Sequence, residues 1–352
     1  MTHMKSLRGL RMAGAVSLAG SIAALAPISA AADPVADFYK EATVTILVGG
    51  SPGGNHNHYS SLIHPFVKKY LPGHPTVIVT NMPGAGGTKA ANYLYNVAPK
   101  DGGMIGIVLA DTPSASRLRA TGVRYDPKQF QYLAGADRTV ETLAIWKSAG
   151  VRSIEDAKKK EVLIGASGKS SKTYVIPSMM NAIFGTKFKV IVGYKGMTQI
   201  ELAMERGEVQ GRHGVWASMK SIHPDWVAQD RVSHLIVADL KREKELPDVP
   251  LLVELAPNEK DRKVLELISG NAMLGRCWLA PPGVAGDRVA ALRNAFWKAL
   301  HDPEMLAQAR KRNMPITPIA WQELQERAAQ IADTDDAVIE RARELLGLKG
   351  KS

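Results

Sequence analysis

The chain has 352 residues, a formal net charge of +11, 22% charged residues and a single cysteine, Cys277. This length favours two domains, and one cysteine excludes an internal disulfide framework, so we expect Cys277 to be a small buried apolar residue. Charges of both signs are interspersed, which argues against nucleic-acid binding, and the basic excess favours attraction of small acidic molecules.

The N-terminal segment has the composition of a secretory signal peptide. Three basic residues between Lys5 and Arg11 precede an apolar run of small residues that ends at Ala32. A basic region, an apolar stretch and an A-x-A site are the parts of such a peptide, while Pro27 argues against the alternative of a membrane anchor. We expect cleavage near Ala32 and a periplasmic mature chain. Its net charge would be +8, because residues 1–32 carry three basic residues and no acid.

Apolar runs then alternate with glycine-rich turns and helical patterns. Runs at 44–48, 77–80 and 162–165 each lead into such a turn, and a further run covers 105–109. Short apolar strands that alternate with helices indicate an α/β fold with largely parallel strands.

The alternation breaks near 140–147 and again near 270–280. We therefore predict two α/β lobes with a ligand cleft between them and a hinge of two segments. Residues 33–140 would begin lobe 1, residues 141–270 would form lobe 2, and residues 271–352 would return to lobe 1 and add the C-terminal helices.

Local signals place several helix boundaries. Ser153 and Thr198 each precede an acid by three residues, which predicts a capped helix start at both. Pro65 predicts a helix that begins near Ser61, because proline is tolerated in the first turn. The charged amphipathic pattern over 321–346 predicts one long helix or a helix pair.

The three glycine-rich turns are candidate ligand cradles. Glycines allow close approach of the backbone, and unpaired N–H groups at helix starts bind anions, so three such turns around one cleft favour an anion site. Tight strand-to-helix turns are the plainer alternative. The sequence does not match the two common nucleotide-binding motifs. Leu163 stands where the P-loop needs a glycine, and Lys89 stands where the dinucleotide fingerprint needs one.

The stretch GGSPGGNHNH ends in two histidines, His56 and His58, whose role the sequence leaves open. They could bind a metal, although zinc needs three or four ligands and only His74 or His213 could supply a third. They could instead hydrogen-bond a carboxylate, or be ordinary surface histidines. A secreted hydrolase is a further alternative, although the serines of GASGKSS fit helix capping better than nucleophilic catalysis.

The chain resembles the solute-receptor family of tripartite tricarboxylate transporters, also called Bug-type periplasmic receptors. The resemblance rests on VTILVGGSPGG, PTVIVTNMPGAGGTKAANYLYNVAPKDG, GASGKSS, VGYKGMTQIELAMERGEVQG, LPDVPLLVELA and LAPPGVAGDRVAALRNAFWKALHDPE, in the family's order. It implies a periplasmic-binding-protein-like fold without catalysis, cofactor or bound metal. It also implies a monomer that closes on a small organic anion and passes it to a large and a small transmembrane permease subunit.

The resemblance also implies a set of ligand-binding residues. These lie in four loops and two further segments: Gly53, Gly54, Asn55, His56 and Asn57; Pro83, Gly84, Ala85 and Gly86; Ser167, Ser170 and Ser171; Tyr194, Lys195 and Gly196; Thr112 and His213. The first loop departs from the family pattern, because Asn57 and Ser61 stand where relatives commonly have an acid and an arginine. This departure puts the usual ligand, and the geometry that holds it, in doubt.

Overall fold

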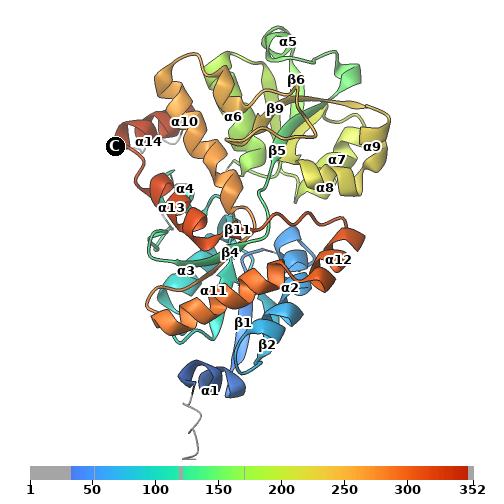
Figure 1. The fold of residues 1–352 in the computed structure, drawn as a ribbon. Coiled ribbons are helices and arrows are strands. Elements are labelled where there is room, and N and C mark those ends of the chain that lie inside the picture. Colours follow the sequence, from blue (N-terminus) through green and yellow to red (C-terminus); the bar gives the residue numbers. More distant parts are fainter. Residues whose placement is uncertain (1–32, 51, 119–121, 170, 348–352) are drawn as a thin grey trace, which may run out of the picture. The chain divides into compact units, whose positions relative to one another are not determined.

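A computed structural model describes residues 33–50, 52–118, 122–169 and 171–347 (Figure 1). The predicted signal peptide and Ser170 lie outside the described residues. Within the described part of the chain, no helix is both long and apolar enough to cross a bilayer. The fold is mixed α/β with two separate sheets, as predicted. The expectation of largely parallel strands was wrong, because each sheet combines parallel with antiparallel pairs.

The first sheet has six strands in the order β11-β4-β10-β3-β1-β2. β1 is parallel to β2 and β3, whereas β10 runs antiparallel to β3 and β4. The strands of this sheet are β1 (Thr43–Val48), β2 (Thr76–Asn81), β3 (Met104–Ile107), β4 (Gln131–Gly135), β10 (Cys277–Ala280) and β11 (Ile319–Ala320).

The second sheet has five strands in the order β7-β6-β8-β5-β9. β6 is parallel to β7 and β8, whereas β5 is antiparallel to β8 and β9. The strands of this sheet are β5 (Glu141–Trp146), β6 (Val162–Ala166), β7 (Phe188–Val192), β8 (Gly211–Val215) and β9 (Val232–Ala238).

Helices connect and cover the strands. The α-helices are α1 (Pro34–Glu41), α2 (Asn55–Tyr70), α3 (Thr88–Asn96), α4 (Thr112–Leu118), α5 (Ile154–Lys159), α6 (Lys172–Phe184), α7 (Met197–Glu205), α8 (Trp216–Ile222), α9 (Pro224–Ala228), α10 (Glu259–Ser269), α11 (Gly286–Leu300), α12 (Pro303–Lys311), α13 (Trp321–Ala332) and α14 (Asp336–Leu345). Short 3₁₀ helices cover Ala85–Gly87, Lys147–Ala149, Leu252–Leu255 and Gly270–Leu274. The predicted C-terminal pattern is therefore a helix pair, α13 and α14.

The prediction that a helix begins near Ser61 was wrong, because α2 begins at Asn55 and carries Pro65 in its interior. Its apolar residues face the first sheet, and this burial stabilises a 16-residue helix despite the proline. Ser61 and Pro65 are both exposed, so water can bind the Ser61 carbonyl that loses its helical donor.

The two predicted caps had different outcomes. Ser153 forms a capping box with Asp156, as predicted. Thr198 does not cap α7, because the helix already begins at Met197 with Gly196 before it. The acid three residues after Thr198, Glu201, is buried and lies 3.1 Å from the guanidinium of Arg212. Glu201 therefore forms an ion pair with Arg212 and does not take part in a helix cap.

Three hydrophobic clusters fill the interior. One lies between the first sheet and the pair α2 and α11, and a small one surrounds Trp226 in the second sheet's region. The largest includes β4 and β10 of the first sheet, β5 and β6 of the second, and helices α10, α13 and α14. Cys277 is buried in this largest cluster, and burial raises the pKa of its thiol to about 12. The thiol therefore stays protonated and apolar, as expected.

Candidate functional site

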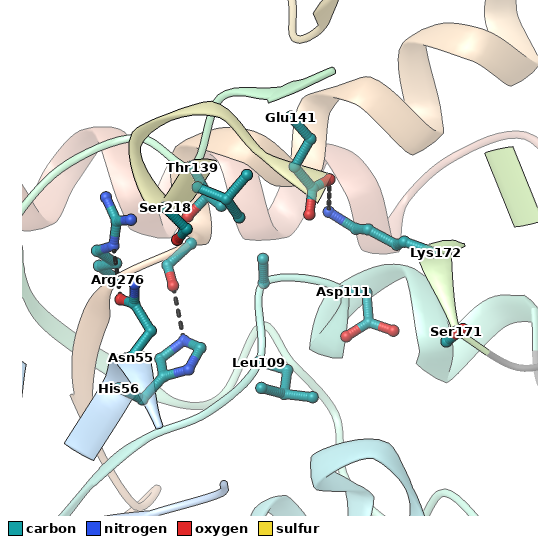
Figure 2. Close-up of a pocket in the computed structure, with 13 residues that line it drawn as sticks. Asn55, His56, Leu109, Asp111, Thr139, Glu141, Ser171, Lys172, Ser218 and Arg276 are labelled. Carbon is teal, nitrogen blue, oxygen red and sulfur yellow. Dashed lines mark hydrogen bonds and ion pairs between the residues drawn. The ribbon is translucent and has the colours of Figure 1, made fainter. Parts of the chain in front are cut away.

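A cavity of about 300 Å³ is lined by loops of both sheets (Figure 2). It meets the carboxyl ends of the parallel strands β1, β3, β6 and β8, and the amino ends of the antiparallel strands β5 and β10. Ligands of α/β proteins bind at such strand ends. The lining residues are Asn55, His56, Leu109, Ala110, Asp111, Thr139, Glu141, Ser171, Lys172, Val215, Ser218, Gly275 and Arg276.

Arg276 provides a fixed, buried cation in this lining. It donates from Nη1 to Asp137 Oδ2 at 2.9 Å and from Nε to Asn55 Oδ1 at 3.1 Å. The guanidinium also lies 4.6 Å from the ring centroid of Tyr59. Burial raises the pKa of Asp137 to about 6, although Arg276 opposes this shift. The cation is thus held in place before any ligand arrives.

His56 lines the cavity as a neutral ring. Its Nε2 lies 2.8 Å from the carbonyl oxygen of Gly275, which can only accept, so Nε2 carries the proton. Burial lowers the pKa of His56 to about 4, and the nearby charge of Arg276 lowers it further. The remaining nitrogen, Nδ1, is therefore an acceptor, and His56 cannot donate a hydrogen bond from it to a carboxylate at neutral pH.

Lys172 and Glu141 form a second charged pair in the lining. Lys172 Nζ donates to Glu141 Oε2 at 2.8 Å, and both side chains are largely buried. Burial alone would raise the pKa of Glu141, but the charge and hydrogen bond of Lys172, together with His213 and Arg276, outweigh it and hold that pKa below its ordinary value. The Glu141 carboxyl is therefore ionised at neutral pH.

The comparisons with known proteins agree with this architecture. The family model described as "Tripartite tricarboxylate transporter family receptor" matches residues 68–344. The chain belongs to this receptor family. Its members are solute-binding receptors, so the coarse activity of the chain is solute binding.

Two solved structures resemble the receptor in fold. A TctC solute-binding protein from Polaromonas is 18% identical to this chain, with a TM-score of 0.65. The match covers 86% of this chain and 99% of the Polaromonas chain. MatC from Rhodopseudomonas palustris, solved with bound malate, is 19% identical to this chain, with a TM-score of 0.60. The match covers 86% of this chain and 98% of the MatC chain. A curated relative, the "UPF0065 protein in gbd 5′ region" of Cupriavidus necator, is 25% identical over 340 residues, covering 93% of this chain and 96% of the relative.

The cavity of the receptor brings together three of the predicted site residues: Asn55, His56 and Ser171. The Ser171 hydroxyl donates to Gly168 O at 2.8 Å, in the turn before α6. Gly53 and Gly54 directly precede Asn55 in the chain. Ser170, the neighbour of Ser171, lies outside the described residues.

Four other predicted residues lie outside the lining, with contacts of their own. Asn57 accepts from Gly53 N at 3.2 Å and donates to Asn81 at 3.0 Å, so it braces the first loop against β2. Ser167 N donates to the Thr173 hydroxyl at 3.1 Å. Thr112 is buried and donates to Leu109 O at 2.7 Å. His213 is buried beside Glu141, and burial lowers the pKa of its ring to about 4.

Two of the predicted loops do not reach the cavity. Pro83, Gly84, Ala85 and Gly86 follow β2, and Tyr194, Lys195 and Gly196 follow β7. β2 and β7 are edge strands, so their loops lie at the outer margins of the two sheets. Ala85 has a positive φ of 47° in an exposed turn, which fits the tight-turn alternative for this loop.

None of the four charged lining residues was predicted as a site residue. Glu141 and Arg276 fall in the two segments where the strand–helix alternation breaks. A charged residue in a segment where the chain passes between lobes could have been used to predict a site residue. Lys172 directly follows the GASGKSS turn, and Asp111 comes two residues after the apolar run 105–109. The lining also includes Leu109, Ala110, Thr139, Val215, Ser218 and Gly275.

The structure also bears on the two alternative functions. His58 is exposed, and the described residues contain no group of three or more His, Cys, Asp or Glu side chains placed to hold a metal ion. In the cavity, the His56 ring bonds the Gly275 carbonyl and the Ser171 hydroxyl bonds Gly168 O. Neither contact is the serine–histidine pair that a hydrolase would need.

Proposed function

We propose that the chain is a periplasmic receptor that captures a small organic carboxylate and passes it to a tripartite tricarboxylate-type permease with a large and a small membrane subunit. The observation that carries this proposal is the cavity lined from both sheets, with Arg276 and Lys172 in its wall. A ligand that touches both sheets favours the state in which they approach each other.

The proposal assigns the sheets to two lobes with a hinge of two segments. Residues 33–140 and 271–352 would form lobe 1, and residues 141–270 would form lobe 2. Residues 1–32 would be the export signal. The family's description supports the permease, and malate bound to MatC supports a carboxylate as the ligand class.

The test is a ligand screen on purified, untagged mature protein. Mono-, di- and tricarboxylates and aromatic acids are added singly, and the melting temperature and tryptophan fluorescence are recorded. Trp216 lies between the lining residues Val215 and Ser218 in sequence, so its emission should report binding. The carboxylate proposal fails if no compound changes either signal. Metal analysis of the same protein tests the alternative that uses His56 and His58.

A matched pair of lysine variants tests the site. Lys172→Gln removes a cation from the lining and should weaken binding of a carboxylate by about tenfold or more, the effect of one charge-assisted hydrogen bond. Lys195→Gln removes the same charge from the exposed loop after β7 and should leave the affinity within about twofold, the size of a weak surface effect. The opposite ranking would move the site to the loop after β7.

A further inference from the structure

The first turn of α2 places a hydrogen-bond donor and an acceptor at neighbouring positions of the cavity wall. Asn55 and His56 are the first two residues of this helix, and both line the cavity. Asn55 Oδ1 accepts from Arg276 Nε at 3.1 Å, so the other end of its amide, Nδ2, is a donor. His56 Nε2 donates to the Gly275 carbonyl at 2.8 Å, so Nδ1 is an acceptor. In Figure 2 the His56 ring lies between Asn55 and Leu109.

The surroundings of His56 keep this acceptor in place. Burial, with a smaller contribution from the charge of Arg276, lowers the pKa of the ring to about 4, although the hydrogen bond to Gly275 opposes the shift. A second proton on the ring would lie near a guanidinium that Asp137 and Asn55 hold in position. Nδ1 therefore keeps its lone pair at neutral pH.

The other acidic and carbonyl acceptors of the lining are already engaged within the protein. Glu141 accepts from Lys172 at 2.8 Å, Asp111 also interacts within the chain, and the Gly275 carbonyl accepts from His56. His56 Nδ1, in contrast, has no hydrogen-bond partner among the described residues. A ligand that covers Nδ1 without donating to it leaves an unpaired acceptor away from water, which costs free energy.

Helix starts around the cavity favour an anion but cannot satisfy this acceptor. The helices α2, α4, α6 and α8 begin at lining residues or directly after them. Their first N–H groups donate, and each helix start carries a partial positive charge. These groups and Arg276 suit a carboxylate, which only accepts and so cannot bond to Nδ1. The ligand therefore needs a separate donor group for His56.

Resting on the proposed function, we infer that His56 is a specificity-determining residue whose Nδ1 accepts a hydrogen bond from a hydroxyl group of the ligand. The ligand is then a hydroxycarboxylate. Its hydroxyl lies near a carboxylate, because Asn55 presents a donor from the adjacent position of α2. A hydroxyl fits better than an ammonium group, since the Arg276 guanidinium and the N-terminus of α2 repel a second cation there.

The experiment compares carboxylates that differ by one hydroxyl group. Isothermal titration calorimetry at pH 7.5 measures lactate against propionate, malate against succinate, and citrate against tricarballylate. The tightest-binding compound of the carboxylate screen is also measured against its own hydroxylated or deoxy counterpart. In each pair that binds, the hydroxylated member should bind about tenfold more tightly, because the deoxy member leaves the acceptor unpaired.

A matched pair of histidine variants assigns this preference to one ring. His56→Phe keeps a flat ring and removes both nitrogens, so the affinity ratio within each pair should fall to about one. His58→Phe makes the same change at an exposed position of α2 outside the lining and should keep the ratio of the unaltered protein. His56→Gln retains an amide donor for Gly275 and a carbonyl acceptor, so it should keep a preference for the hydroxylated member. Melting temperatures show which variants are folded.

The outcomes separate this inference from the proposed function. If the deoxy member binds as tightly as the hydroxylated member in every pair, the inference is wrong and the carboxylate receptor stands. An equal loss of affinity for both members in folded His56→Phe, with the ratio unchanged, would give the ring a structural role only and would also overturn the inference. If no carboxylate of any kind binds, the inference and the proposed function both fail.

Discussion

Asp137 shows how one residue supports the cavity wall. It lies behind Arg276 and is largely buried, and its pKa of about 6 is above the ordinary value of 3.8. A carboxyl group whose pKa is raised by folding binds a proton more readily in the native state than in the unfolded chain. Its contribution to stability is therefore complete below about pH 3.8 and is lost as pH rises through about 6.

Asp137→Asn should consequently flatten the pH profile of stability. The amide keeps an acceptor for Arg276 but cannot ionise. Between pH 4 and pH 7.5, the variant should gain about 2 kcal/mol of unfolding free energy relative to the unaltered protein, from a pKa difference of about two. Urea unfolding at pH 4, 5, 6 and 7.5 measures this difference. Asp248→Asn, at an exposed acid, is the control, and a difference that stays constant with pH would contradict the assignment.

At the scale of elements, α7 and β8 are joined by a buried ion pair. Arg212 Nε lies 3.1 Å from Glu201 Oε1, and both side chains are about 1% exposed or less. His223 Nε2 lies 3.2 Å from the other oxygen of Glu201, and its ring stacks on Trp226 at 3.9 Å between centroids. Glu201 therefore links a helix, a strand and the aromatic cluster.

Glu201→Met should destabilise the fold strongly, by about 3–5 kcal/mol, because it leaves the Arg212 charge buried without its partner. The double variant Glu201→Met/Arg212→Met should cost much less than the sum of the two single variants, because the unpaired charge is gone. Urea unfolding of all four proteins gives the coupling energy. As a reference, Arg262→Ala at an exposed helix pair should change the unfolding free energy only slightly, because solvent screens the pair. Additive costs at Glu201 and Arg212 would refute the coupling.

The sequence predicted elements better than it predicted the site. Apolar runs and glycine turns located β1, β2, β6 and the start of α6, because these signals are local in the chain. The order of strands in a sheet is not local. The strand order places the turn after β1 at the cavity, and it places the turns after the edge strands β2 and β7 away from the cavity.

Arg276 and Glu141 were not predicted as site residues for the same reason. Arg276 and Glu141 lie at the amino ends of antiparallel strands, β10 and β5, whose sheet partners include residues far away in sequence. No local residue pattern near Arg276 or Glu141 predicts which strands β10 and β5 will pair with. His56 was predicted as a ligand-binding residue, but the acceptor role of its Nδ1 depends on the Gly275 carbonyl, 219 residues away.

At the scale of the whole molecule, the two sheets share a hydrophobic core. The largest cluster contains Tyr132 and Leu279 from the first sheet and Leu143 and Ile164 from the second, and residues from Pro34 onward form one compact unit. Exposing the part of this cluster that belongs to one sheet would also expose the part that belongs to the other. The cost of that exposed apolar surface favours cooperative unfolding.

We therefore expect one unfolding transition in spite of two sheets. Trp278 is buried in the first sheet, whereas Trp146 and Trp226 are buried beside the second. The triple variant Trp278→Phe/Trp297→Phe/Trp321→Phe leaves Trp146, Trp216 and Trp226 as reporters of the second region. The triple variant Trp146→Phe/Trp216→Phe/Trp226→Phe leaves Trp278, with Trp297 of α11 and Trp321 of α13, as reporters of the first. Within each variant, urea midpoints from fluorescence and from far-ultraviolet circular dichroism should coincide, because both probes follow the same event. Two separated midpoints in either variant would mean that the sheets unfold independently and that the shared cluster does not couple them.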